Sequence, residues 1–190
     1  LLPQRQPGYR QTTIKEPIGP VAAFAPWNFP GVMFGRKIAA ALGAGCSMII
    51  KPSEESPGVS SGIVKACQDA GVPDGVLNMV MGDPAMISDY LIRSPIIAKV
   101  SLTGSVSVGR QLSKLAGELL KPATMELGGH APVLVFGDAD AEKAADMTAG
   151  FKYRNAGQTC VCSNRFYVQE SVYEEFATKF AAKVKTAKVG

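Results

Sequence analysis

The sequence predicts a protein of the α/β class, with a parallel β-sheet flanked by helices. Short apolar segments bounded by glycine and proline alternate with longer segments whose apolar residues recur at helical spacing, which is typical of βαβ units. The apolar segments are also nearly continuous, as in strands that are buried on both faces. After Gly128 and Gly129 the same pattern starts again, so we expect the beginning of a second α/β domain.

The first block of this pattern holds five expected strands and four expected helices. The strands are expected at residues 21–25, 47–50, 76–80, 96–102 and 123–125. The helices are expected at residues 34–42, 56–70, 84–92 and 105–119. Ser56-Pro57 offers an N-cap residue followed by proline at the first helical position. This alternation predicts a Rossmann-like parallel sheet with helices on both of its faces.

The second block is shorter than the first. A polar segment at the N-terminus precedes both blocks. The block is expected to contain a strand at 132–136, a helix at 141–153, a strand at 165–169 and a helix at 172–188. The first twenty residues are polar and punctuated by proline, and residues 11–15 are expected to form an exposed, extended arm. The chain begins without methionine and ends where a helix-like segment stops. We therefore expect a piece of a longer protein, with parts at 1–19, 20–127 and 128–190.

Composition and charge exclude several classes of protein. A chain of 190 residues that is 46% hydrophobic can bury a core, unlike a disordered or collagen-like chain. The net charge of +4 comes from dispersed residues, so we expect no nucleic-acid partner. No apolar run reaches the roughly 18 residues of a membrane helix, so we expect no membrane partner. Four cysteines favour a reducing compartment, the cytoplasm or, in a eukaryote, the mitochondrial matrix.

Two polar stretches follow the first two strands, at the edge where parallel α/β sheets bind ligands. Asn28, within Pro26-Trp27-Asn28-Phe29-Pro30, offers an amide that can donate to an oxyanion. The alternative is an Asx-turn between two prolines. Lys51-Pro52-Ser53-Glu54 places a carboxylate where dinucleotide-binding sheets hold ribose hydroxyls, and a solvated loop charge pair is the alternative.

Two further stretches follow the fourth and fifth strands. Residues 103–109 pass from a strand into a helix, where backbone amides and the helix dipole can hold an anion. They match neither the dinucleotide fingerprint nor a Walker loop, and a purely structural turn is the alternative. Glu126 precedes two glycines that let the backbone approach a ligand. A half-buried Glu126 would have its pKa raised towards that of a general base; an ordinary loop glutamate is the alternative.

The most informative stretch is residues 155–162, which contain Cys160 and Cys162. The other two cysteines lie far off in sequence and His130 is the one histidine, so we expect no metal site. A cysteine hydrolase would depend on that same histidine, and no motif supports it. What remains is a thiol in a polar, glycine-containing loop, against the alternative of two buried core cysteines.

Taken together and in this order, the five stretches resemble the motifs of the aldehyde dehydrogenase superfamily. They are P-W-N-F-P, K-P-S-E, T-G-S-x-x-x-G, E-L-G-G and G-Q-x-C, and the resemblance extends over residues 17–170. Residues 125–132 and 153–162 most resemble the succinate-semialdehyde dehydrogenase branch. The resemblance implies that residues 1–19 belong to a bridging or oligomerisation arm. It also implies an NAD(P)-binding domain at 20–127 and the first part of a catalytic domain at 128–190.

The resemblance also implies the roles of the site residues. Cys160 would be the nucleophile, Glu126 the general base, and Asn28 with the Cys160 backbone N–H the oxyanion hole. The thiolate would add to an aldehyde, hydride would pass to the nicotinamide, and an activated water would hydrolyse the thioester. The residues implied to line the cofactor site are Trp27, Asn28, Lys51, Ser53, Glu54, Gly104, Ser105 and Leu127. The full-length form is expected to be a homo-oligomer, a dimer or a tetramer.

Substrate and cofactor preferences follow as hypotheses. Arg36 and Arg154 stand where the succinate-semialdehyde branch holds the distal carboxylate of its substrate, so a short aldehyde acid such as succinic semialdehyde is expected. A surface arginine is the alternative at each position. Glu54 would meet a 2′-phosphate with like charge, so we expect NAD to be preferred over NADP, with Lys51 softening the discrimination.

Some features depart from the family pattern or stay open. Leu102 stands where phenylalanine is usual, and the downstream glutamate that contacts the nicotinamide ribose in the family is absent from these 190 residues. Two other functions compete, an aldehyde dehydrogenase for a different aldehyde and a cofactor-binding fragment without catalysis. Cys162 is a possible redox partner that would trap a sulfenic acid on Cys160 as a reversible disulfide, and packing is its alternative.

Overall fold

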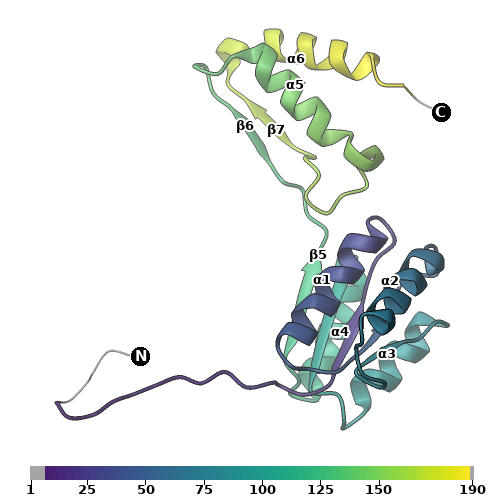
Figure 1. The fold of residues 1–190 in the computed structure, drawn as a ribbon. Helices are drawn as coiled ribbons and strands as arrows, with labels where there is room; N and C mark the ends of the chain where they lie inside the picture. The colour runs from purple at the N-terminus through teal and green to yellow at the C-terminus, as the bar shows by residue number, and fades with distance from the viewer. Residues whose placement is uncertain (1–6, 189–190) are drawn as a thin grey trace. The chain divides into compact units, whose positions relative to one another are not determined.

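The computed structural model describes residues 7–188, and it divides into two compact units (Figure 1). The first unit is Leu1–Glu126 and the second is Leu127–Gly190. Residues 7–18 are exposed and form neither helix nor strand. None of the helices in the described part of the chain is long and apolar enough to cross a lipid bilayer.

The first unit is built on a parallel sheet in the order β3-β2-β1-β4-β5. Its strands are β1 Val21–Phe24, β2 Met48–Lys51, β3 Leu77–Met79, β4 Lys99–Gly104 and β5 Ala123–Leu127. Val21 pairs with Met48 on one side and with Lys99 on the other, both in parallel register. The strand order reverses between β1 and β4, and such a reversal opens a ligand crevice at the carboxyl ends of the strands. The predicted fold class is confirmed.

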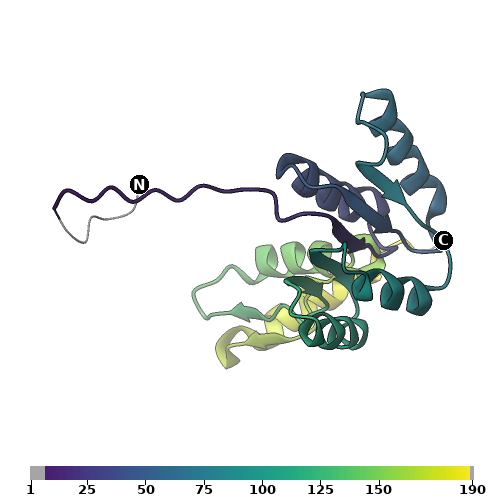
Figure 2. The same cartoon turned by 90° about the horizontal axis from the view of Figure 1, so that it is seen from below.

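Two helices cover each face of this sheet (Figures 1 and 2). They are α1 Pro30–Gly43 and α2 Pro57–Asp69 on one face, and α3 Pro84–Arg93 and α4 Val106–Glu118 on the other. Phe34 and Ile38 of α1 pack against Ala23 of β1 and Ile50 of β2 in a buried cluster. Burial of these apolar side chains is the main source of stability on that face.

The beginnings of the helices correct several expectations. Helix α1 begins at Pro30 rather than at residue 34, because proline at the first helical position already has the φ angle of a helix. Helix α2 begins after Ser56 as predicted, but the Ser56 side chain forms no capping hydrogen bond. Instead, the Ser56 carbonyl accepts from Ser60 Oγ at 3.3 Å. Strand β4 begins at Lys99 rather than at residue 96, because a turn hydrogen bond from Ile97 N to Ser94 O precedes it.

The second unit contains a two-stranded parallel sheet and two long helices. These elements are β6 Val133–Val135, α5 Ala141–Lys152, β7 Phe166–Val168 and α6 Glu170–Lys185, with a 3₁₀ turn at Arg154–Gly157 that the sequence analysis did not anticipate. Its core contains Val135, Ala145 and Phe176, and Phe166 and Phe180 complete an aromatic cluster with ring centroids 5.3 Å apart. The core of this unit is small.

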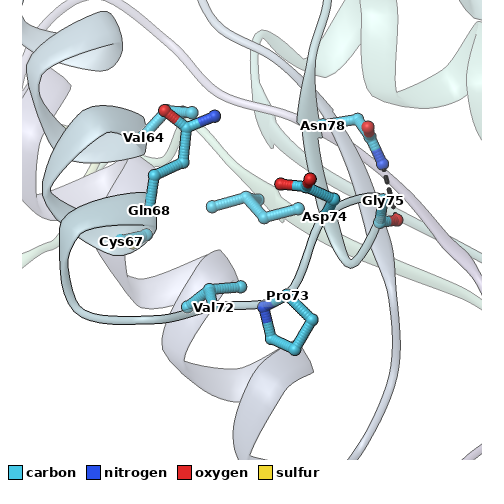
Figure 3. Close-up of a pocket in the computed structure, with 9 residues that line it drawn as sticks. Val64, Cys67, Gln68, Val72, Pro73, Asp74, Gly75 and Asn78 are labelled. Atoms are coloured by element: carbon cyan, nitrogen blue, oxygen red, sulfur yellow. Dashed lines mark hydrogen bonds between the residues drawn. The ribbon is translucent and has the colours of Figure 1, made fainter.

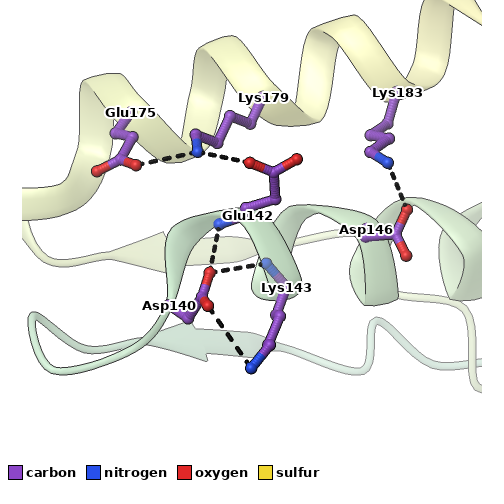
Figure 4. A network of polar contacts seen from close by, with 7 residues as sticks. All are labelled: Asp140, Glu142, Lys143, Asp146, Glu175, Lys179 and Lys183. Carbon is purple, nitrogen blue, oxygen red and sulfur yellow. Dashed lines mark hydrogen bonds and ion pairs between the residues drawn. The ribbon is translucent and has the colours of Figure 1, made fainter.

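Ion pairs link the exposed sides of α5 and α6 (Figure 4). Lys179 Nζ lies 2.9 Å from Glu142 Oε2 and 3.2 Å from Glu175 Oε1, and Lys183 Nζ lies 2.9 Å from Asp146 Oδ1. The hydrogen bond from Lys179 holds the pKa of Glu142 below its usual range. Exposed pairs of this kind each contribute little to stability, but they join helices that share a small core.

Candidate functional site

Four of the predicted stretches lie at the carboxyl edge of the sheet in the first unit. Asn28 is half-buried in the loop after β1, and Lys51 is the last residue of β2. Ser105 directly follows β4, and Glu126 lies in the last part of β5. Because the carboxyl ends of parallel strands meet at one edge, this topology places the four stretches where α/β proteins bind their ligands.

A buried lysine orients the carboxylate that follows β2. The Lys51 side chain is 5% exposed, and its Nζ donates to the Pro52 carbonyl at 2.9 Å and to the Glu54 carboxylate. The hydrogen bond from Lys51 holds the pKa of Glu54 below its usual range. Because the cation is buried, this is not the fully solvated loop pair of the alternative interpretation. The carboxylate itself is 48% exposed and accessible to a ligand.

The junction of β4 and α4 has the features of an anion-binding turn. Ser105 is the N-cap of α4, and its Oγ accepts from Val108 N at 3.3 Å and lies 3.0 Å from Ser107 Oγ. At Gly104 an added Cβ would lie 3.2 Å from a terminal methyl carbon of Leu102, so a larger residue would require the Leu102 side chain to shift. The N-terminus of a 13-residue helix carries partial positive charge, which suits a phosphate group.

The structure adds a residue that the sequence analysis missed. Lys37 of α1 is half-buried, and its Nζ donates to Ser101 Oγ of β4 at 2.8 Å. Burial lowers the pKa of Lys37 to about 8, while the charge of Glu126 acts in the opposite direction. The signal was available in the sequence, because Lys37 lies three residues after Phe34 and four before Ala41, on the inner face of the helix. A titratable lysine therefore lies within electrostatic range of the predicted general base.

Glu126 itself lies in an open environment within the first unit. The residue is exposed within the first unit rather than half-buried. The reason is topological, because β5 is the last strand at one end of the sheet and has a neighbour on one side only. Glu126 lies at the carboxyl edge of the sheet, and within the first unit its exposure is that of the alternative, an ordinary loop glutamate.

In the second unit, the two cysteines of the most informative stretch occupy different environments. Cys160 is half-buried, and its carbonyl accepts from Gly129 N at 3.2 Å. Cys162 is 2% exposed, and its Sγ donates to the Lys152 carbonyl at 3.3 Å. Only Cys160 has partial access to solvent, as a reactive thiol requires.

The remaining predicted residues are placed as follows. Trp27 is 46% exposed, and Ser53 Oγ accepts from Glu55 N at 3.3 Å. Arg36 and Arg154 are both exposed, Arg36 on α1 and Arg154 in the 3₁₀ turn. The first unit therefore holds Asn28, Glu126 and most of the predicted cofactor residues, and the second holds Leu127 and Cys160. Among residues 7–188, no three His, Cys, Asp or Glu side chains gather as a metal ion would require.

A cavity of about 190 Å³ lies elsewhere in the first unit, between α2 and the loop before β3 (Figure 3). Cys67, Asp74 and Leu77 are among the residues that line it. The cavity contains none of the predicted site residues. It lies near the amino end of β3, opposite to the edge where the motifs gather, so we do not assign it to the functional site.

The model of the aldehyde dehydrogenase family matches residues 1–190. The chain belongs to this family. It is 46% identical to the glutarate-semialdehyde dehydrogenase of Pseudomonas putida, and it is 44% identical to the NADP(+) succinate-semialdehyde dehydrogenase GabD of Escherichia coli. Each match covers 100% of this chain and 39% of the relative. The chain therefore spans about two-fifths of the length of these relatives.

A solved structure supports the same assignment. The crystal structure of succinate-semialdehyde dehydrogenase from Burkholderia pseudomallei superimposes with a TM-score of 0.90 and 49% sequence identity. The superposition covers 93% of this chain and 37% of that one. The predicted resemblance to the aldehyde dehydrogenase superfamily is confirmed.

The residues of this aldehyde dehydrogenase chain fit a dinucleotide. The buried Lys51 donates a hydrogen bond to the exposed Glu54 carboxylate, which can accept from ribose hydroxyls. The α4 N-terminus, with its serine cap, supplies amides for a phosphate. Both features lie at the edge of the sheet that the strand order marks as the crevice.

Proposed function

We propose that the whole protein oxidises an aldehyde to a carboxylate with NAD(P), through a thioester on Cys160. The observation that carries the proposal is the half-buried Cys160 within a chain that matches the aldehyde dehydrogenase family over residues 1–190. The nicotinamide cofactor, when bound, accepts a hydride from the aldehyde carbon. Lys51, Glu54, Ser105 and the α4 N-terminus would hold it.

The chain's own residues carry the remaining steps. The Cys160 thiolate attacks the aldehyde carbon and forms a carbon–sulfur bond, and the carbonyl oxygen becomes an oxyanion that Asn28 stabilises by donating a hydrogen bond. Loss of the hydride leaves a thioester on Cys160. Glu126 then takes a proton from a water molecule, whose oxygen attacks the thioester carbon. The carbon–sulfur bond breaks, the carboxylate leaves, and the thiolate is restored.

Substitution of the nucleophile and of the base in the full-length protein tests this mechanism. We expect Cys160→Ser to lower aldehyde oxidation by at least about a thousandfold, because a hydroxyl is a far weaker nucleophile than a thiolate. Glu126→Gln should give a rapid burst of reduced cofactor followed by slow turnover, because hydrolysis alone loses its base. Cys67→Ser is the matched control and should keep its activity. Retention of a tenth of the activity by Cys160→Ser would overturn the proposal.

The proposed substrate is a short aldehyde acid such as succinic semialdehyde. Two relatives are named for succinate and glutarate semialdehyde, which both carry a distal carboxylate. Arg36 and Arg154 are exposed guanidinium groups, one on each unit, and guanidinium binds carboxylates in bidentate geometry.

A comparison of charged and uncharged substrates tests this choice in the full-length protein. We expect kcat/KM for succinic semialdehyde to exceed that for butanal by at least about a hundredfold. Arg154→Gln or Arg36→Gln should remove most of this difference without lowering the butanal rate. Arg110→Gln, an exposed arginine on α4, is the control. Equal efficiency on the two aldehydes would favour the alternative, an aldehyde dehydrogenase with a different substrate.

The proposed cofactor preference is for NAD over NADP. A 2′-phosphate near Glu54 would meet a carboxylate whose low pKa keeps it charged at neutral pH, although the paired Lys51 offsets part of this repulsion. In the full-length protein, Glu54→Ser should improve NADP relative to NAD by roughly tenfold, in line with removal of one like charge. Glu55→Ser, which changes the neighbouring exposed carboxylate, should leave the ratio unchanged. An unchanged ratio in Glu54→Ser would refute the preference.

The remaining alternative is a chain that binds the cofactor without catalysis. Titration of the 190-residue chain with NAD, alongside an activity assay on the same sample, separates the two cases. Binding without turnover would assign this piece a cofactor-binding role only.

A further inference from the structure

The loop that carries Cys160 begins with an unusual backbone turn. Asn155, Ala156 and Gly157 have φ angles of 53°, 56° and 77°, so three consecutive residues adopt the left-handed conformation. This conformation is unfavourable for a residue with a Cβ, and only glycine and, to a lesser degree, asparagine adopt it readily. Hydrogen bonds from Ala156 N to Tyr153 O at 3.1 Å and from Gln158 N to Asn155 O at 3.0 Å close the turn.

A second contact holds the same loop on the C-terminal side of Cys160. Cys162 Sγ donates to the carbonyl of Lys152, the last residue of α5, at 3.3 Å. Carbonyls in the last turn of a helix have no partner within the helix, and the thiol supplies a donor to one of them. The Cys162 side chain is 2% exposed, which removes competing water from this contact.

Gly157 leaves room for this contact. A Cβ at position 157 would lie 3.3 Å from the Lys152 carbonyl and 3.9 Å from Cys162 Sγ. The left-handed turn therefore brings the chain past the end of α5 at the point where the thiol reaches the carbonyl. The Lys152 carbonyl oxygen therefore accepts from the Cys162 thiol and also lies close to the backbone of Gly157.

Cys160 lies in the chain between the left-handed turn at residues 155–157 and Cys162. Cys162 N donates to Thr159 O at 3.0 Å and closes a tight turn around Cys160. The Cys160 carbonyl is held separately by Gly129 N at 3.2 Å. These two hydrogen bonds hold the backbone on both sides of the Cys160 side chain.

We propose that Cys162 is a positioning residue for Cys160, because its thiol fastens the nucleophile loop to the end of α5. This inference rests on the proposed function only in assigning Cys160 as the nucleophile. The competing explanation is passive packing, in which a small apolar side chain fills the space and its hydrogen bond is incidental.

The test measures the reactivity of Cys160 directly, in the full-length protein, with iodoacetamide as the probe. The alkylation rate of Cys160 is followed by mass spectrometry of its peptide at several pH values, for the parent protein and for Cys162→Ala and Cys162→Ser. We expect Cys162→Ala to slow alkylation of Cys160 at least fivefold and to change its pH profile, because the loop loses its attachment. Cys162→Ser keeps a donor of similar size and should stay within twofold of the parent.

Two further variants serve as a second test of the contact with the Lys152 carbonyl and as a control for unspecific effects of a cysteine substitution. Gly157→Ala keeps the thiol but places a methyl group against the Lys152 carbonyl, so it should slow alkylation as Cys162→Ala does. Cys67→Ala changes a half-buried cysteine on α2 and should leave the rate unchanged. Parent-like alkylation in Cys162→Ala, or equal slowing in Cys162→Ala and Cys162→Ser, would overturn the proposal in favour of packing. Because alkylation requires no turnover, this result is independent of whether the protein oxidises aldehydes.

Discussion

The two units are stabilised by different means, and the predicted site residues therefore lie on supports that differ in how well they are packed. In the first unit, fully buried residues such as Phe34, Ile50 and Val100 fill both faces of a five-stranded sheet. In the second unit, a two-stranded sheet leaves Leu134 and Tyr167 more than half exposed, and ion pairs join the two helices. The predicted cofactor residues therefore lie mainly on a well-packed support, whereas Cys160 depends on local turns and a small core.

The largest expected effect tests the packed core of the first unit. Phe34→Ala removes a side chain that is 0% exposed, and such truncations cost about 3–5 kcal/mol in the free energy of unfolding. We expect amides of α1 and β2 to lose protection in hydrogen exchange, while those of α5 and α6 keep theirs. Tyr90→Ala, at a side chain 76% exposed, is the control and should change little. Equal loss of protection in both units would show that they unfold as one.

The next effect concerns the one described lysine whose pKa burial lowers strongly, to about 8. Burial disfavours the charged form, so between pH 8 and 10.5 the unfolded chain binds more protons than the folded one. The stability of the parent should therefore rise with pH across this range. The buried charge costs up to about 3 kcal/mol at pH 7, at 1.36 kcal/mol for each pKa unit.

Lys37→Met should remove this cost at pH 7 and abolish the rise with pH, as measured by urea unfolding at several pH values. The loss of the hydrogen bond to Ser101 offsets part of the gain. Lys114→Met, at an exposed position on α4, is the matched control. A parent-like pH dependence in Lys37→Met would show that another group titrates in this range.

The environment of Lys37 is also an example of a feature that the sequence did not predict, whereas the strands and the site motifs were predicted. Strands β1 and β2 follow from continuous apolar runs, and the site motifs follow from their positions after strands. Three features were not predicted: the environment of Lys37, the exposure of Glu126 and the left-handed turn at Asn155–Gly157. The first two depend on which elements cover a residue, and the third depends on contacts beyond the local sequence, since alanine alone does not favour a positive φ.

A smaller effect tests the role of charge in the second unit. Asp140 caps α5 by accepting from Glu142 N and Lys143 N, and these hydrogen bonds hold its pKa below the usual 3.8. A carboxyl with a lowered pKa stabilises the folded state above its unfolded value and loses this contribution as the pH falls through the folded pKa. Asp140→Ala should therefore lower the urea midpoint of the second unit at pH 7, and the difference from the parent should shrink as the pH falls through the folded pKa of Asp140. Asp138→Ala, at an exposed position before the cap, serves as the control.

The smallest expected effect concerns the reversible oxidation of the nucleophile loop. A Cys160 sulfenic acid could be trapped by Cys162 as a disulfide, but the Cys162 thiol must first leave its buried hydrogen bond to Lys152. In the full-length protein we therefore expect dithiothreitol to restore only a minor part of the activity that peroxide removes, because over-oxidation of Cys160 competes with the trapping step. Cys162→Ala should lose even this recovery. Equal recovery in Cys162→Ala would leave Cys162 with no redox role, and recovery of nearly all the activity in the parent would show that the loop opens more easily than its contacts indicate.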